Sequence, residues 1–489
     1  MGATGSRHRF AVQVLPLTSV FVALLLLASL APGDTRQVGA LVHGPRDGRP
    51  NIVLIVSDDQ RLESLDGMTQ VQRLLVDRGT RFSQGMVPTA LCCPSRSSIL
   101  TGLYSHSTRV YGNGRVGGRR FGGWTQFYRR GLESRTLATA LQAAGYRTGL
   151  FGKYLNDFST FAPEGYQPPG WNRFLAFAGP NAAYYNYRLS DGTWHGSAAR
   201  DYSTDLLAER ARRFIRNTPR DKPVFVMFTP YAPHRPYTSA PRHASVRVDA
   251  PAILGQRPAA ADLLPTAQGE WPLPPRQPDI ATWGVYRHLV AQRELPSIAE
   301  AQTRALLAVD EAVGSLVSVA RRTGRERDTL FVYLSDNGYL WGEHGMLGKD
   351  VPYAPATRIP LVVRWDGRVP AGLVEDRLAL NLDVTTTIAG AARAPMQTDG
   401  LDLLGRSTRQ GFVLEAMGGN WGRPAYCGWR TRDHMYLQWA DGRTELYDYR
   451  VDPGETLNLA GQTAARRVEA SLRAQAVRAC TPEPPGFSW

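Results

Sequence analysis

Residues Leu91–Gly102 read LCCPSRSSILTG, and this stretch decides how the fold of the chain is understood. It contains the pattern C-x-P-S-R from Cys92 to Arg96, followed by an apolar run that predicts a helix. Arg96 stands one helical turn after Cys92, so a helix would direct its fixed charge back toward that cysteine. Taken alone, Cys92 and Cys93 could equally be two small buried hydrophobic residues, so the rest of the chain has to supply the other parts of a site.

Four apolar runs of strand length predict strands buried on both faces, as in a parallel sheet covered by helices. Polar or charged residues follow each run closely. Because ligands bind at the carboxyl edge of such sheets, we expect these residues to meet at one edge. The runs are Asn51–Val56, Thr148–Phe151, Pro223–Thr229 and Thr329–Leu334.

Asp58 and Asp59 follow the first of these runs. Two carboxylates at the end of a buried strand repel each other unless a cation lies between them. For an isolated pair, a solvated turn is the usual alternative. Asp336 and Asn337 follow the last run and offer two more oxygen ligands, which would complete the ligand set of a hard cation.

Lysine is rare in this chain: of 57 basic residues, only Lys153, Lys222 and Lys349 are lysines. Each therefore invites a chemical reason, because lysine is a compact charge that can hold one oxygen or pass a proton. Lys153 comes just after the second apolar run. His234 follows the third run, between two prolines that stiffen its loop, although a lone histidine is more often structural than catalytic.

The C-x-P-S-R pattern and these strand ends, in this order, resemble the type I sulfatase family. The resemblance implies an α/β fold like that of alkaline phosphatase, with a large mixed, mostly parallel sheet flanked by helices and a small C-terminal antiparallel α+β domain. It also implies that a formylglycine-generating enzyme oxidises Cys92 to formylglycine. One hydroxyl of the hydrated aldehyde would then attack the sulfate, and the other would later lose its proton and expel it.

The resemblance also implies roles for the strand-end residues. One divalent cation, most often calcium and otherwise magnesium, would lie beside residue 92, the lysines would hold sulfate oxygens, and His234 would protonate the leaving group. The implied metal ligands are Asp58, Asp59, Asp336 and Asn337, and the implied catalytic residues are Cys92, Arg96, Lys153, His234 and Lys349.

The sequence GKYLN at Gly152–Asn156 resembles the branch that contains N-acetylglucosamine-6-sulfatases and the extracellular heparan 6-O-endosulfatases. The family usually has a histidine where this chain has Leu155, which leaves open the group that deprotonates the formylglycine hydrate. Asn156 could only hydrogen-bond, and Asn156 and His344 are candidate substrate-binding residues. The family often has Tyr-Glu after the second lysine; here Ala354 follows the tyrosine, so we expect the support of that loop to differ.

Further elements follow from apolar periodicity and end signals. We predict a long surface excursion over Ser239–Leu295, then a helix that Ser297 caps, with Glu300 completing a capping box and the helix ending at Ala320. The segments Arg358–Trp365 and Asn381–Ala389 close the large domain. Other predicted helices are Val71–Val76, Leu137–Ala144 with Thr136 as cap, Asp205–Ile215 and a last one to about Cys480; short strands begin at Gly411.

The domain organisation predicted from the sequence begins with a signal peptide over residues 1–33, because a basic start precedes an apolar run from Phe10 to Ala31. An uncleaved membrane anchor is the alternative. A leader over residues 34–50, a catalytic domain over 51–400 and a small C-terminal domain over 401–489 follow. The signal predicts a secreted or extracytoplasmic protein.

The formal charge of +14 suits acidic ligands such as sulfated sugars. Nucleic acid would also fit such a charge, but no nucleic-acid-binding motif accompanies it. Cys427 and Cys480 could pair in an oxidising compartment, and two free thiols are the alternative.

The function expected from these features is a sulfuric ester hydrolase that acts on sulfated sugars such as N-acetylglucosamine 6-sulfate. The alternatives are an arylsulfatase, a phosphate or phosphonate monoester hydrolase of the same superfamily, and a non-catalytic binder of sulfated glycans if Cys92 is never oxidised. Exo or endo action and the oligomeric state stay open at this point.

Overall fold

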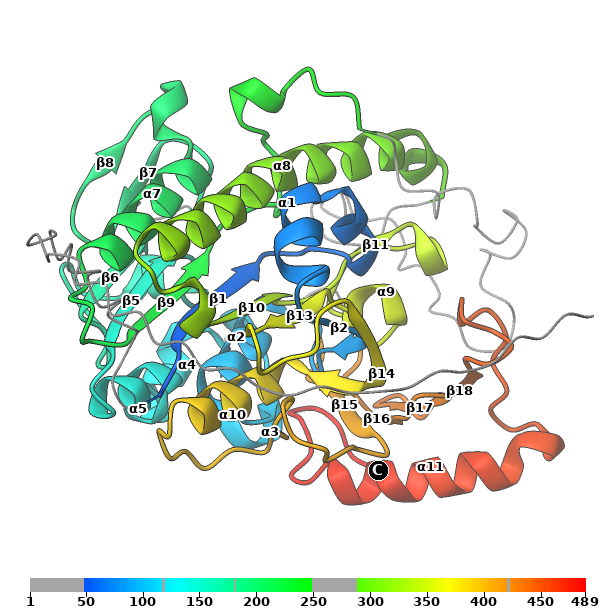
Figure 1. Ribbon diagram of the computed structural model, residues 1–489. Helices are drawn as coiled ribbons and strands as arrows, with labels where there is room; N and C mark the ends of the chain where they lie inside the picture. The colour runs from blue at the N-terminus through cyan, green and yellow to red at the C-terminus, as the bar shows by residue number, and fades with distance from the viewer. Residues whose placement is uncertain (1–47, 117–118, 180–181, 249–287, 420–422) are drawn as a thin grey trace, which may run out of the picture. The chain divides into compact units, whose positions relative to one another are not determined.

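The four predicted buried strands lie side by side at the centre of the protein, in the computed structural model shown in Figure 1. The structure describes residues 48–116, 119–179, 182–248, 288–419 and 423–489. The predicted signal peptide and most of the leader lie outside these residues. In the ranges described, no helix combines the length and apolar character that crossing a bilayer requires.

The central strands run parallel in the order β10 (Thr329–Ser335), β1 (Asn51–Ser57), β9 (Val224–Thr229) and β5 (Arg147–Gly152). Ser57 pairs with Ser335, and Gly152 pairs with Thr229, so the four strands end at the same edge. This confirms the predicted common edge.

Six further strands extend this sheet within the described part of the chain, which makes it mixed but mostly parallel, as predicted. β6 continues the parallel order beyond β5, and β14 runs parallel to β2, whereas β13, β7 and β8 are antiparallel to their neighbours. The bounds are β2 (Thr80–Met86), β6 (Arg173–Ala178), β7 (Tyr187–Leu189), β8 (Trp194–His195), β13 (Leu361–Arg364) and β14 (Leu373–Leu380).

Helices cover both faces of this sheet (Figure 1). β1 requires this, because its apolar side chains point to both faces and all of its residues are buried. Val53 and Ile55 pack toward α7 (Ser203–Arg216) and α8 (His288–Arg322), whereas Ile52, Leu54 and Val56 pack toward the opposite layer. That layer contains α2 (Cys92–Thr101), α4 (Gly123–Arg129), α5 (Leu137–Ala143) and α10 (Asn381–Ala391).

Most predicted helices are confirmed within a few residues. Thr136 caps α5 by accepting a hydrogen bond from the Thr139 amide, as predicted. The predicted segment Val71–Val76 is helical as part of α1 (Thr69–Val71) and the wider turns over Gln72–Val76.

The predicted start of the long helix is wrong. α8 begins at His288, nine residues before Ser297, so Ser297 lies inside the helix and the surface excursion is shorter than predicted. Glu300 does not close a capping box but pairs with Arg304, one turn further on, at 2.8 Å. Residues 249–287 of the predicted excursion lie outside the described ranges.

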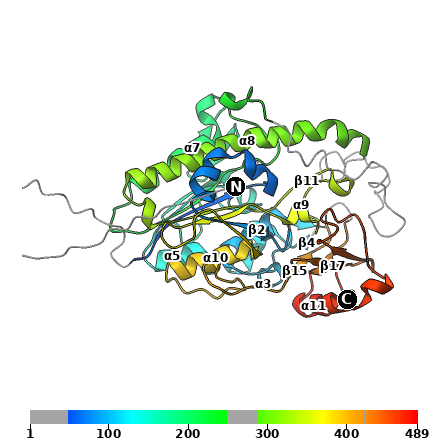
Figure 2. The same ribbon diagram turned by 45° about the vertical axis from the view of Figure 1, so that its right-hand side comes forward.

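A second, antiparallel sheet is built by the C-terminal part of the described chain, as predicted (Figure 2). Its strands, in order, are β15 (Phe412–Ala416), β16 (Tyr426–Arg430), β17 (His434–Trp439) and β18 (Thr444–Asp448). The last helix, α11 (Arg466–Ala479), packs on β16 and β17. Cys427 of β16 and Cys480, just after α11, form a disulfide with Cα atoms 6.3 Å apart, which decides between the pairing and the two free thiols that the sequence left open.

Gly152 ends β5 immediately before Lys153 and has a φ of +128°, which residues with a Cβ rarely adopt. A Cβ at this position would lie 1.9 Å from the Thr229 carbonyl oxygen. Gly165, by contrast, has a φ of +73° and nothing within 4 Å of such a Cβ.

We expect Gly152→Ala to lower the free energy of unfolding by at least about 2 kcal/mol, because collision with β9 adds to backbone strain. Gly165→Ala should cost about 1 kcal/mol, the backbone term alone. Scanning calorimetry of both variants measures the difference through Tm. Equal losses of Tm would contradict the close approach of β5 and β9 at this point.

Candidate active site at the carboxyl edge of the sheet

The ends of the central strands are tied to one another by backbone hydrogen bonds. The Asp336 amide donates to Ser57 at 3.1 Å, and the Asp58 amide donates to Ala232 at 3.2 Å. The Lys153 amide donates to Thr229 at 2.8 Å. The residues that follow four strands therefore converge on one place.

Cys92 is the first residue of α2 and is 1% exposed. Its Sγ lies 3.6 Å from Oδ1 of Asp58, 4.0 Å from Oδ1 of Asp59 and 2.7 Å from Nζ of Lys349. Burial raises the pKa of the Cys92 thiol to about 12, even though Lys153 and Lys349 act in the opposite direction. The unmodified side chain is thus a neutral thiol at physiological pH, and a thiol is a far weaker nucleophile than a thiolate.

Each carboxylate of the aspartate pair contacts a different lysine. Nζ of Lys153 lies 2.5 Å from Oδ2 of Asp58, and Nζ of Lys349 contacts Oδ1 of Asp59. Burial alone would raise the pKa of Asp58, but Lys153 and other cations lower it to about 2. Burial alone would raise the pKa of Asp59 as well, but Lys349 and the other cationic groups around it together lower it. Both carboxylates are therefore ionised at neutral pH.

Arg96 contacts the carboxylates rather than the thiol. Its Nε donates to Oδ2 of Asp336 at 2.8 Å, its Nη1 donates to the Lys153 carbonyl at 3.0 Å, and its Nη2 lies 3.6 Å from Asp58. The side chain is 1% exposed. Arg96 therefore fixes two carboxylates and the Lys153 backbone, and its charge also acts electrostatically on Cys92.

His234 lies at the open side of the cluster, with a side chain that is 26% exposed, compared with 4% for Asp59. Its Nδ1 lies 2.8 Å from the Arg235 carbonyl, so Nδ1 carries a proton and donates it there. Nε2 points into the cluster, 3.6 Å from Oδ2 of Asp59. Tyr184 further fixes the loop, because its hydroxyl donates to the His234 carbonyl at 2.7 Å.

The residues present fit a divalent cation. Oxygens of Asp58 and Asp59 lie within 4.8 Å of each other and of the Cys92 and His234 ligand atoms. Oδ1 of Asn337 is buried and has no hydrogen-bond partner among the described residues, whereas its Nδ2 donates to Asp59 at 2.8 Å. An oxygen that is otherwise unsatisfied is what a cation would use.

The charge of the cluster supports the same conclusion. Among the described residues at this edge, the carboxylates of Asp58, Asp59 and Asp336 are matched by three fixed cations, Arg96, Lys153 and Lys349. A divalent cation would make the site net positive, which an anionic ester requires.

Four further residues singled out in the sequence have the following surroundings. Leu155 is 4% exposed in the apolar core, so it has no part in proton transfer. Oδ1 of Asn156 is buried without a hydrogen-bond partner in the described ranges. His344 stacks on Tyr353 at 3.9 Å and lies 3.5 Å from Glu455 with 5% exposure, which leaves it little surface for a substrate. Lys222 is exposed before β9, at the opposite end of that strand from His234.

Three residues near the site were not predicted from the sequence. Oδ1 of Asn113 accepts the Cys93 amide at 2.9 Å and so satisfies the first turn of α2. The hydroxyls of Tyr237 and Tyr339 meet at 2.8 Å, and each tyrosine follows a residue of the cluster in the chain. The sequence offers only weak signs of these residues: the Asn113-Gly114 turn dipeptide, and the positions of Tyr237 and Tyr339 three residues after His234 and two after Asn337.

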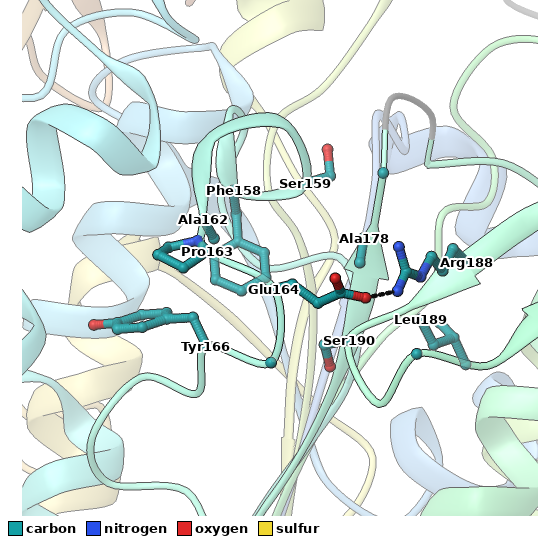
Figure 3. Close-up of a pocket in the computed structure, with 13 residues that line it drawn as sticks. Phe158, Ser159, Ala162, Pro163, Glu164, Tyr166, Ala178, Arg188, Leu189 and Ser190 are labelled. Atoms are coloured by element: carbon teal, nitrogen blue, oxygen red, sulfur yellow. Dashed lines mark hydrogen bonds and ion pairs between the residues drawn. The ribbon is translucent and has the colours of Figure 1, made fainter.

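A separate cavity of about 160 Å³ lies between α6 (Phe158–Phe161), β6 and β7 (Figure 3). The exposed pair of Arg188 and Glu164 spans it. None of the residues predicted for the active site lines this cavity, so it does not compete with the strand-end cluster for the chemistry.

Comparison with known proteins agrees with this geometry. The family model described as Sulfatase matches residues 50–394, and the model described as N-sulphoglucosamine sulphohydrolase, C-terminal, matches residues 342–480. The chain is 33% identical over 374 residues to the extracellular sulfatase SULF-1 homolog of Drosophila melanogaster, which covers 74% of this chain and 32% of that protein. It is 32% identical over 427 residues to human N-acetylglucosamine-6-sulfatase, which covers 82% of this chain and 71% of the human protein.

The chain thus spans about a third of the fly relative's own length and most of the human relative's. A solved structure of a protein in complex with its substrate D-glucosamine-2-N,6-O-disulfate shares the fold, with a TM-score of 0.71 at 22% identity, over 89% of this chain and 99% of that one. With a family model that covers well over half of its length, this chain belongs to the sulfatase family.

Proposed function

We propose that this protein is a sulfuric ester hydrolase that cleaves sulfate monoesters of sulfated sugars, with N-acetylglucosamine 6-sulfate as the model substrate. The observation that carries the proposal is the convergence of Asp58, Lys153, His234, Asp336 and Lys349 on Cys92 at the start of α2. The sequence similarity to human N-acetylglucosamine-6-sulfatase supports the choice of sugar.

Cys92 is the proposed site of conversion to formylglycine by a formylglycine-generating enzyme. When present, formylglycine supplies a hydroxyl nucleophile together with a second hydroxyl that allows sulfate to leave. The position of Cys92 at the start of α2, in contact with Asp58, Asp59 and Lys349, supports this.

Asp58, Asp59, Asp336 and Asn337 are the proposed ligands of one divalent cation, calcium in the first instance and magnesium as the alternative. These donors are hard oxygens, which suit calcium or magnesium rather than zinc. When bound, the cation supplies positive charge beside residue 92. Arg96 holds Asp58 and Asp336 in place for it.

Lys153 and Lys349 are proposed to hold two sulfate oxygens, because they flank residue 92 from separate strand ends. Charge that grows on those oxygens in the transition state is stabilised by ammonium groups already in position. His234 has its Nδ1 proton committed to the Arg235 carbonyl, so Nε2 faces the ester oxygen, and the doubly protonated ring is the form that can deliver a proton from Nε2. Burial lowers the pKa of His234, whereas Asp59 and Asp58 favour this protonated form.

We further propose that residues 1–33 direct export and that the mature enzyme is secreted or extracytoplasmic, in a catalytic domain over 51–400 and a small domain over 401–489. The name of the fly relative, an extracellular sulfatase, supports this location.

Sulfated sugars, aryl sulfates, and phosphate and phosphonate monoesters of matched alcohols form the decisive assay panel. The proposal expects the highest kcat/KM on a sulfated sugar. A preference for phosphate or phosphonate esters would instead make the protein a hydrolase of the wider superfamily, and a preference for aryl sulfates would make it an arylsulfatase. If protein with formylglycine at position 92 binds sulfated glycans but does not hydrolyse them, the remaining function is that of a non-catalytic binder of sulfated glycans.

Cys92, and not Cys93, should carry the aldehyde when the protein is made together with a formylglycine-generating enzyme. Peptide mass spectrometry of the 92–93 peptide tests this, and Cys92→Ala should abolish turnover because no nucleophile is left. Fully active protein with an intact Cys92 thiol would disprove the assignment.

Metal analysis of active protein should find about one calcium or magnesium per chain. Asp58→Ala should remove both the cation and the turnover, because it deletes a ligand and leaves Lys153 without its partner. Zinc in the active enzyme, or full activity of the Asp58 variant, would overturn the ligand set.

Replacing Lys153 or Lys349 by alanine should lower kcat on the order of 100-fold or more, because each removes charge that stabilises the transition state. Lys222→Ala is the matched control, since Lys222 is exposed away from the site and should leave kcat unchanged. Comparable losses in all three variants would mean that the effect is not local to the site.

His234→Ala should reduce turnover of sugar sulfates far more than turnover of activated aryl sulfates, whose leaving groups need little protonation. Steady-state kinetics on both substrate types measures the ratio. An equal penalty on both would show that another group is the leaving-group acid.

A further inference from the structure

The loops that carry Cys92 and Lys349 are joined to each other by a backbone contact. The Asp350 amide donates to the Ala90 carbonyl at 2.8 Å, one residue beyond Lys349 and two residues before Cys92. The distance of 2.7 Å between Nζ of Lys349 and Sγ of Cys92 depends on this junction. Asp350 makes the contact from a φ of +70°, in the left-handed region that residues other than glycine seldom adopt, although Asp does so more readily than most.

The Asp350 side chain is held by Arg423, which lies three residues before β16 of the C-terminal sheet. Nη2 of Arg423 donates to Oδ1 of Asp350 at 2.9 Å and to the Met417 carbonyl at 2.8 Å, and Nη1 donates to the Pro424 carbonyl at 2.9 Å. The guanidinium also lies 5.1 Å from the centre of the Tyr426 ring. With 10% of its side chain exposed, Arg423 is a fixed connector rather than a flexible surface ion pair.

The same sheet also holds the other loop. The Glu415 amide of β15 donates to the Pro88 carbonyl at 3.2 Å, and the Thr89 hydroxyl donates to the Glu415 carbonyl at 2.9 Å. β15 therefore holds the Cys92 loop through Glu415, and Arg423, three residues before β16, holds the Lys349 loop.

We propose that Arg423 is a positioning residue for catalysis: by locking Asp350, it sets Lys349 at its working distance from residue 92. The inference rests on the proposed function, in which Lys349 holds a sulfate oxygen. It makes the C-terminal sheet part of the catalytic apparatus, although Arg423 itself touches no reacting group.

A second anchor keeps the loop folded when Arg423 is changed. The Glu455 carboxylate accepts the Ala354 amide at 2.9 and 3.1 Å and is 1% exposed. Arg423→Met should therefore displace Lys349 without releasing the whole segment, which makes the variant a test of position rather than of folding.

The experiment compares Arg423→Met, Arg423→Lys and Asp350→Asn with Arg432→Met. Arg432 is the matched control, because it pairs with Asp376 at 2.8 Å and also joins the C-terminal region to the main sheet, but both side chains are about 60% exposed. Formylglycine content is measured by mass spectrometry in every variant, so that incomplete conversion of Cys92 is not mistaken for misplacement of Lys349.

We expect Arg423→Met to lower kcat by about 10- to 100-fold with little change in KM, because a shift of about 1 Å in a catalytic charge has effects of that size. Arg423→Lys should recover part of the loss, and Arg432→Met should behave as the unchanged protein. In a Lys349→Ala background, Arg423→Met should have almost no further effect, since the residue acts through Lys349. A merely structural residue would reduce activity equally in both backgrounds.

The inference is overturned if Arg423→Met and Arg432→Met have the same kcat. It is also overturned if Arg423→Met lowers kcat as much in the Lys349→Ala background as in the unchanged protein. Failure of the proposed function is seen separately, in the ester preference of the unchanged protein, and the variants are compared on whichever ester it cleaves. If it cleaves none, calorimetric titration with inorganic sulfate replaces kinetics. Weaker sulfate binding by Arg423→Met than by Arg432→Met then supports the inference, and equal binding rejects it.

Discussion

The buried carboxylate pair of Asp58 and Asp59 is the constraint on which the site depends. Two adjacent negative charges at the end of a buried strand lose most of their hydration, and they are tolerated only if cations reach them with good geometry. The chain meets this requirement with Lys153, Lys349 and Arg96, each from a different element of the fold. The parallel order of β10, β1, β9 and β5 is what allows segments hundreds of residues apart to deliver these groups to one point.

This constraint explains why strand ends were predictable and side-chain partners were not. An apolar run followed by a charged residue reveals both a buried strand and its carboxyl end, so Asp58, Lys153, His234 and Asp336 could be placed on one edge from the sequence. The sequence predicted that Arg96 lies one helical turn after Cys92, but it did not predict the hydrogen bond from Arg96 to Asp336. Its direction is set by Asp336, which reaches it from β10, 240 residues away in the chain.

Local signals in the sequence were misleading at one helix start and silent at two polar residues. Ser297 and Glu300 have the spacing of a capping box, but α8 continues through them and Glu300 takes Arg304 as its partner. Asn113 and Arg423 are ordinary polar residues in the sequence, and only the backbone groups that they meet give them a role. Because the only two other cysteines are adjacent, the sequence limited the choice to a bond between Cys427 and Cys480 or two free thiols, and the structure shows the bond.

The chain departs from the family pattern at Leu155, where a histidine is usual, and at Ala354, where a glutamate is often found, and the structure treats the two positions differently. Leu155 is absorbed into the apolar core, so the chain offers no proton-transfer group at that position. At Ala354 the missing carboxylate is matched by one from elsewhere, because Glu455, beyond β18, accepts the Ala354 amide with both oxygens. The two family models overlap over residues 342–394, the segment that holds both Lys349 and Ala354. That segment contacts the C-terminal region through Asp350 and Ala354, so a boundary drawn near residue 400 separates Lys349 from Arg423 and Glu455, the residues that hold its loop.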